Sequence, residues 1–134
     1  MRTAILDYLT ANRTDLKPLV VVEGLPWVDS GTELYFLNKR HIYVDLDQVK
    51  QDPLIDTLNS TGVINETTTV SVYFVTDAKT PYSKFEDAIS TIKDARLTTD
   101  ITGVTARTCQ VTNTYESDVV LTTFEFSFKK LITN

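Results

Sequence analysis

The side chains best suited to hold a metal ion are three aspartates, Asp45, Asp47 and Asp52. Their spacing is similar to the oxygen ligands of a calcium-binding loop. Such a loop also needs a glycine at its sixth position and a glutamate at its twelfth, and both are missing here. One cysteine and one histidine give no zinc-ligand spacing either. The sequence therefore predicts no metal site and no other cofactor.

The two residues that could serve a nucleophilic reaction are Cys109 and His41, and they lie far apart in the chain. A cysteine nucleophile needs a base beside it, so this pair favours no catalytic site. A lone cysteine in a strand is typical of a small buried apolar residue, and it forms no disulfide within the chain. His41 shares a predicted strand face with Asp45, which permits a histidine–aspartate contact.

The glycines also fail to form a phosphate-binding loop, since Gly24, Gly31, Gly62 and Gly103 stand far apart. We therefore predict that the chain is not an enzyme.

Length and composition predict one domain covering residues 1–134, of ordinary globular composition, with a net charge of −5. Between His41 and Glu66 the acids exceed the bases by four, because five acids face only Lys50. An acidic protein is poorly suited to clamp DNA phosphates. Threonine is abundant, at 22 residues, and this β-branched residue favours strands.

The N-terminus lacks the apolar core of a signal peptide, because Asp7 interrupts it, and no apolar run is long enough for a membrane span. We expect a soluble protein made in a reducing cytoplasm, with no membrane partner.

The elements that would position these residues begin with the clearest one, a long C-terminal β-hairpin. Residues 104–112 lead through a turn at residues 113–118 into a returning strand at residues 119–129. Alternate residues of this last strand are phenylalanines, and period-two alternation places them on one face. The apolar face holds Phe124, Phe126 and Phe128.

Residues at the predicted turns could contact neighbouring molecules. Tyr115, Glu116 and Asp118 occupy the C-terminal turn, where Tyr115 either packs across its own hairpin or meets a partner. Residues 33–37 and 41–45 are strand-like and flank a short polar turn, so they predict a second hairpin with Lys39 and Arg40 at its tip. A solvated turn or a charged contact with a neighbour both fit these two residues.

The N-terminal part predicts an amphipathic helix at residues 3–11 and a short buried strand at residues 19–22. An irregular loop at residues 24–31 follows and carries the only tryptophan. Trp27, with Val28 beside it, either folds over the core or docks onto a partner, since tryptophan is enriched at interface hot spots.

Residues 47–58 favour one or two helical turns, interrupted by Pro53. Residues 70–76 predict a central strand covered on both faces. Thr80–Pro81 or a capping box at residues 83–86 would start a second helix, whose apolar face is Phe85, Ala88, Ile89 and Ile92. The fold class is therefore α+β: a mainly antiparallel sheet with a long C-terminal hairpin, packed by an N-terminal helix and a helix near residues 81–96.

This succession of elements, with the aromatic–aspartate stretch of residues 42–45 and the closing stretch of residues 121–128, resembles the tail terminator and tail-completion proteins of long-tailed (siphovirus-type) bacteriophages. The resemblance spans nearly the whole chain and rests on patterns of residue class. It implies a structural virion protein at the head-proximal end of the tail, assembled in the host cytoplasm.

The implied protein forms a ring of identical subunits, a hexamer, that caps the tail tube and joins tail to head. Its implied partners are the tail tube protein, a head-completion or neck protein, and DNA that passes without specific binding. Two alternatives stay open: a neck or head-completion adaptor, and a small ligand-binding or inhibitory module with a pocket between sheet and helices. On exposure logic the candidate interface residues are Trp27, Val28, Lys39, Arg40, Tyr115, Glu116 and Asp118.

Overall fold

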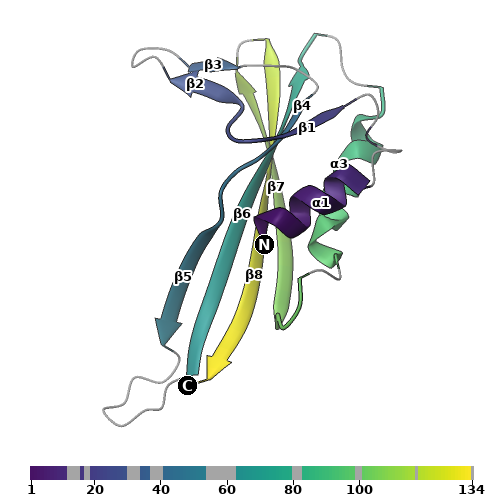
Figure 1. The fold of residues 1–134 in the computed structure, drawn as a ribbon. Coiled ribbons are helices and arrows are strands. Elements are labelled where there is room, and N and C mark those ends of the chain that lie inside the picture. Colours follow the sequence, from purple (N-terminus) through teal and green to yellow (C-terminus); the bar gives the residue numbers. More distant parts are fainter. Residues whose placement is uncertain are drawn as a thin grey trace.

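A long, twisted sheet dominates the computed structural model of the protein, and helices lie beside one half of it (Figure 1). The structure describes residues 1–11, 16, 19–29, 34–36, 41–53, 63–79, 83–98, 101–116 and 118–133. The elements, in chain order, are α1 (Arg2–Ala11), β1 (Val20–Glu23), β2 (Trp27–Asp29), β3 (Leu34–Phe36), β4 (His41–Val44), β5 (Gln48–Pro53), β6 (Val63–Asp77), α3 (Phe85–Lys93), the 3-10 helix η1 (Asp94–Leu97), β7 (Ala106–Glu116) and β8 (Val119–Thr133).

The main sheet has six strands in the order β1-β4-β6-β8-β7, with β5 also paired to β6. Among the described strands of this sheet, β1 and β4 pair in parallel and the other pairs are antiparallel. The strands β2 and β3 form a separate antiparallel pair. The α+β class and the mainly antiparallel sheet predicted from the sequence are confirmed.

The C-terminal hairpin is confirmed and is longer than predicted, because β7 continues to Glu116 and β8 to Thr133. Asn113 was expected in the turn, yet it pairs with Thr122 within the ladder. The buried Thr122 hydroxyl donates a hydrogen bond of 2.8 Å to the Asn113 side-chain oxygen. This cross-strand bond supports a residue type that is normally depleted in strands.

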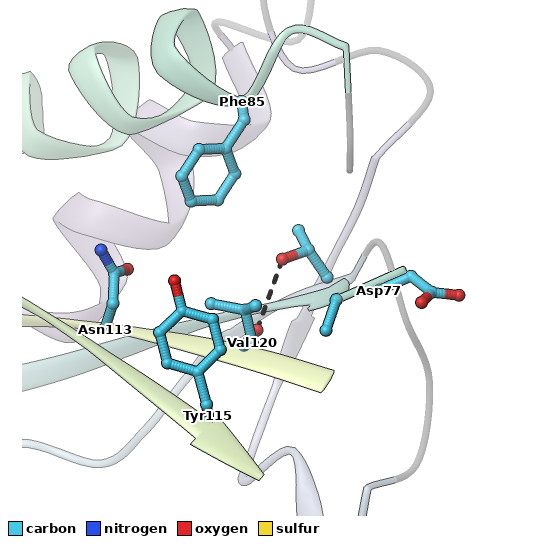
Figure 2. A pocket seen from close by; sticks show the side chains of 7 residues that line it. Asp77, Phe85, Asn113, Tyr115 and Val120 are labelled. Carbon is cyan, nitrogen blue, oxygen red and sulfur yellow. Dashed lines mark hydrogen bonds between the residues drawn. The ribbon is translucent and has the colours of Figure 1, made fainter. Parts of the chain in front are cut away.

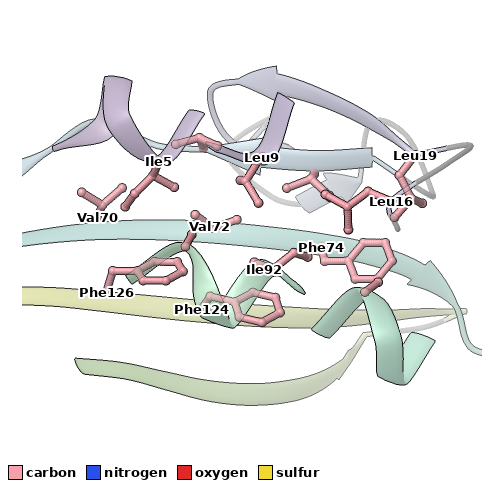
Figure 3. Packing of buried hydrophobic residues seen from close by; sticks show 14 of the residues in the cluster. Ile5, Leu9, Leu16, Leu19, Val70, Val72, Phe74, Ile92, Phe124 and Phe126 are labelled. Carbon is pink, nitrogen blue, oxygen red and sulfur yellow. The ribbon is translucent and has the colours of Figure 1, made fainter. Parts of the chain in front are cut away.

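The main core lies between the helices and one face of the sheet. Phe124, Phe126 and Phe128 are completely buried, as the alternation predicts. Figure 3 shows that β8, the strand that carries them, packs with β6 and with Ile5 and Leu9 of α1. Since each fully buried large apolar side chain contributes roughly 1.5–3 kcal/mol, this face carries much of the stability.

A smaller cluster lies on the opposite face of the sheet, where Tyr43, Val75, Val119 and Leu121 are buried. Because Val72 and Phe74 belong to the main core and Val75 to this second cluster, β6 is covered on both sides at its C-terminal half. The predicted central strand is confirmed.

Both predicted helices form, although the second begins later than expected. In α1 the buried residues are Ile5 and Leu9. Helix α3 begins at Phe85, its N-cap is Lys84, and no side chain caps it, so the predicted capping box at residues 83–86 is wrong, while Thr80 and Pro81 lie outside the described residues. The apolar face is correct, because Ala88 and Ile92 are buried against the sheet.

Four other local predictions are wrong, and each concerns a short segment. The strand β1 is not buried: it lies at the sheet edge, and Val20 is exposed because β1 pairs with β4 alone among the described residues. Part of the predicted loop at residues 24–31 is the strand β2.

The predicted second hairpin does not form, because β3 pairs with β2 while β4 pairs with β1 and β6. Burial explains the pairing of β4 with β1 and β6, because an interior position in the sheet buries Ile42, Tyr43 and Val44. Instead of helical turns, residues 48–53 form β5, in which Val49 alternates with polar residues and Pro53 comes last.

Candidate interaction surfaces

The aspartates considered above as metal ligands make hydrogen bonds and ion pairs within the chain. The Asp45 carboxylate accepts a hydrogen bond of 2.8 Å from the Leu46 backbone N–H. Asp47 accepts one of 2.8 Å from the Arg2 N–H and lies 3.3 Å from the N-terminal amine. The two Asp47 contacts fasten the start of α1 to the segment between β4 and β5. The described residues contain no group of three His, Cys, Asp or Glu side chains that could hold a metal ion.

The two candidate nucleophile residues are separate in the structure as well. His41 stacks on Tyr43, with ring centroids 6.1 Å apart. Cys109 lies half-buried on β7 against the main core. Burial raises the pKa of its thiol to about 11, against a weaker opposing effect of Arg96 and Lys93. Because the thiolate is the reactive species, this environment disfavours reaction of the cysteine at neutral pH.

A small open cavity lies where the start of α3 approaches the tip of the C-terminal hairpin (Figure 2). Its volume is about 200 Å³. Phe85 faces it from the helix, and Tyr115 and Asn113 face it from β7. The lining residues are Thr76, Asp77, Ala78, Phe85, Asn113, Tyr115 and Val120.

The polar groups around this cavity are mostly committed to local contacts. The Thr76 hydroxyl donates to the Val120 carbonyl at 3.4 Å, and Asp77 accepts from the Lys79 N–H at 2.9 Å. Lys79 and Asp118 form an ion pair of 3.7 Å whose side chains are well exposed, so it adds little stability. What the cavity offers a partner is therefore chiefly two aromatic rings, with the single carboxylate of Asp77 in its lining.

Tyr115 is the most exposed large apolar residue of those described, at 75%. It pairs with Val120 at the end of the ladder, and Glu116 pairs with Val119. The Asp118 carbonyl accepts a hydrogen bond of 2.8 Å from the Ala78 N–H, which ties the hairpin tip to the end of β6. The three residues predicted for this turn are thus neighbours at one end of the molecule.

Trp27 lies on the other face of the sheet. Its ring meets Tyr73 edge-on, with centroids 5.0 Å apart and planes at 76°. Partial burial raises the pKa of the Tyr73 phenol. Trp27 remains half-exposed above the second cluster, and Val28 follows it in β2, paired with Tyr35.

The predicted interface residues therefore divide between two surfaces. Tyr115, Glu116 and Asp118 lie at the hairpin tip, and Trp27 with Val28 lies across the sheet. Lys39 and Arg40 lie outside the described residues. For all seven candidate interface residues, a role in contacts with neighbouring molecules stays a prediction.

Sequence reasoning missed one exposed surface, the edge strand β5. Val49 is 58% exposed on it, on the face that carries the main core, and Leu131 at the end of β8 is 48% exposed on the opposite face. Figure 1 shows this end of the sheet extending well beyond α1. The alternation of Gln48, Val49 and Lys50 was the available signal, but it is short.

Comparison with known proteins gives a match of fold. No family model matches the sequence, and no curated protein matches it. Among solved structures, the chain is similar to a chain in the virion of a native gene transfer agent (GTA) particle, with a TM-score of 0.57 and 14% identity. The similarity covers 98% of this chain and 95% of that chain, and at this identity it shows the fold. In the described part of the chain, every helix is too short or too polar to cross a bilayer.

Proposed function

We propose that this chain is a structural virion protein, a tail terminator that caps the tail tube as a ring and joins the tail to the head. The observation that carries the proposal is the similarity in fold, over nearly the full length of both chains, to a protein of a gene transfer agent virion. The sequence pattern that resembles tail terminators points to the same class independently.

Two features of the molecule support a role in assembly. Among the described strands, β5 and β7 each pair along one edge only, so another chain can extend them, and the exposed Tyr115 lines a small cavity at the tip of the C-terminal hairpin. The net charge of −5 also suits a ring through which DNA slides, because few phosphate contacts would hold it.

The decisive experiment adds the purified protein to polymerising tail tube subunits of the same virus and measures tube length by electron microscopy. A terminator stops growth and leaves a ring at one tube end. Unchanged growth, together with binding to isolated heads, would instead identify a neck or head-completion adaptor. A strict monomer that binds neither structure would contradict the whole proposal.

A further inference from the structure

The outer edge of β7 is unusually unprotected. Within the described residues β7 pairs with β8 alone, in a register that runs without a bulge from Ala106 to Glu116. From Thr108 to Tyr115 the strand contains no charged residue and no proline. Natural edge strands normally carry such features, because an open edge is a template for another chain. A long edge without them is suited to receive a strand.

The other open edge of this half of the sheet is β5, which pairs with β6 alone among the described residues. Val49 lies opposite Thr68, on the face of the sheet that carries the main core. It is 58% exposed there, and no other strand covers it within the described part of the chain. This edge therefore presents an apolar side chain on the helix-bearing face.

Strand direction makes the two edges compatible. Going from β5 through β6 and β8 to β7, every pair is antiparallel, so β5 and β7 run in opposite directions. A second copy placed beside the first in the same orientation would therefore bring its β5 antiparallel to β7. This continues the alternation already present in the sheet.

We propose that β7 of one copy receives β5 of a second copy as an antiparallel strand, with Val49 of the second copy opposite Val111. In this register residues 48–53 lie opposite residues 107–112. Val111 and Cys109 are half-buried on the helix-bearing face and pack against the main core, so the incoming Val49 extends that core. On the β7 side, residues 108–112 of this register are uncharged, and Arg107 lies opposite Pro53 at the end of the pairing.

The contact uses two different edges and is therefore heterologous, the kind that repeats from copy to copy and forms a ring when the rotation between copies closes. Pairing of β7 with a second β7 would stop at a dimer and leave β5 and Val49 uncovered. The inference names the subunit contact of the ring and rests on the proposed function to that extent.

Engineered cysteines test this contact. The variant carries Val49→Cys and Val111→Cys, with Cys109→Ala removing the native thiol. The two new residues lie on opposite edges, separated by β6 and β8, so strand spacing alone puts them at least about 14 Å apart within one chain. A disulfide spans less than about 7 Å between Cα atoms, so bonding within one chain is excluded.

Mild oxidation should therefore give a ladder of covalent multimers from the double-cysteine chain, and none from either single variant. Val49→Cys with native Cys109 retained tests a register shifted by two residues. Absence of multimers in both arms overturns the proposal. Covalent dimers from Val111→Cys alone would show β7–β7 pairing and overturn it as well.

Hydrogen exchange on the unmodified protein gives a second measurement, which does not depend on whether an engineered variant folds. The outward amides between Thr108 and Tyr115 should exchange rapidly in dilute protein. On assembly at high concentration their exchange should slow by roughly tenfold or more. Unchanged exchange in the assembled protein, or a strict monomer at every concentration, overturns the inference.

A matched pair of charge variants separates the edge from the sheet face. Thr112 and Ser127 both lie on the face away from the helices, but only Thr112 is on β7. Thr112→Lys should abolish the multimer, and Ser127→Lys should retain it. Equal loss in both variants would place the contact on the face and contradict the proposal.

The outcomes also distinguish this inference from the proposed function. Cross-linked multimers that leave tube growth unchanged support the strand pairing and contradict the terminator role. Capped tubes without any β5–β7 cross-link support the terminator role and overturn the strand pairing.

Discussion

Phe126 illustrates how single residues specify this fold. It is completely buried in the middle of β8, opposite Val70 on one side and Cys109 on the other. Its ring is parallel to that of Phe128, with centroids 6.4 Å apart. Phe126 belongs to the main core between the sheet and the helices, so a smaller side chain there would leave a cavity.

Replacing Phe126 with alanine should therefore lower the free energy of unfolding by about 3–5 kcal/mol, the range for a large-to-small change in a core. Urea denaturation followed by circular dichroism measures this. Ser127→Ala, one residue away on the uncovered face, is the control and should change stability by less than about 0.5 kcal/mol. A similar loss in both variants would contradict the assigned packing.

Cys109 gives a pH-dependent prediction. Its folded-state pKa is raised from 9.0 to about 11, chiefly by burial. Between these values the unfolded chain loses its thiol proton while the folded chain keeps it, so stability should fall as pH rises from 9 to 11. Cys109→Ala should remove this part of the pH dependence.

The alkylation rate of the native thiol checks the same assignment. It should stay low at pH 8 and increase only toward pH 11, whereas the urea-unfolded chain should react readily near pH 9. A native thiol that reacts as fast as the unfolded one at pH 8 would show that it is not shielded.

At the scale of elements, the contact between Trp27 and Tyr73 connects two separate sheets. Trp27 belongs to the β2–β3 pair and Tyr73 to β6 of the main sheet. An edge-to-face aromatic pair adds roughly 0.5–1.5 kcal/mol beyond the area that it buries. This contact therefore helps to hold the small pair over the second cluster.

Because Trp27 is the only tryptophan, its fluorescence reports on this contact. Tyr73→Ala should shift the emission to longer wavelength as water reaches the indole. Tyr115→Ala, a tyrosine at the far face of the hairpin tip, should leave the emission unchanged. An unshifted spectrum in Tyr73→Ala would mean that the indole is covered by other groups.

At the scale of the whole molecule, the exposed Tyr115 should matter for assembly and little for folding. Its ring lines the cavity at the hairpin tip and is 75% exposed, so its removal costs the folded subunit little apolar burial. Tyrosine at an interface centre is a frequent hot spot.

We expect Tyr115→Ala to change the free energy of unfolding by less than about 0.5 kcal/mol while it weakens attachment to tail tubes or heads by at least roughly tenfold. Thr114→Ala, the preceding exposed residue, is the matched control. Normal attachment by Tyr115→Ala in a co-sedimentation assay would exclude the cavity surface from the interface.

The elements with strong periodicity could be predicted from the sequence. Alternating phenylalanines indicated β8 and its buried face, and the spacing of Ala88 and Ile92 indicated the packed face of α3. These patterns depend only on how side chains project from a strand or a helix, which is a local property. The candidate contact residues at the hairpin tip followed from the same local pattern.

Pairing was decided by the tertiary structure. Residues 34–36 and 41–44 looked like one hairpin, but β4 gains more by lying between β1 and β6, where both its edges are bonded and its side chains are buried. The choice depends on β6, more than twenty residues further along, so no local pattern contains it. Likewise β5 is a strand because β6 offers it an edge, and Val49 became a candidate contact only once that edge was visible. Sequence alone determined which faces are apolar, and the fold decided which edges remain open, because strand pairing joins distant segments.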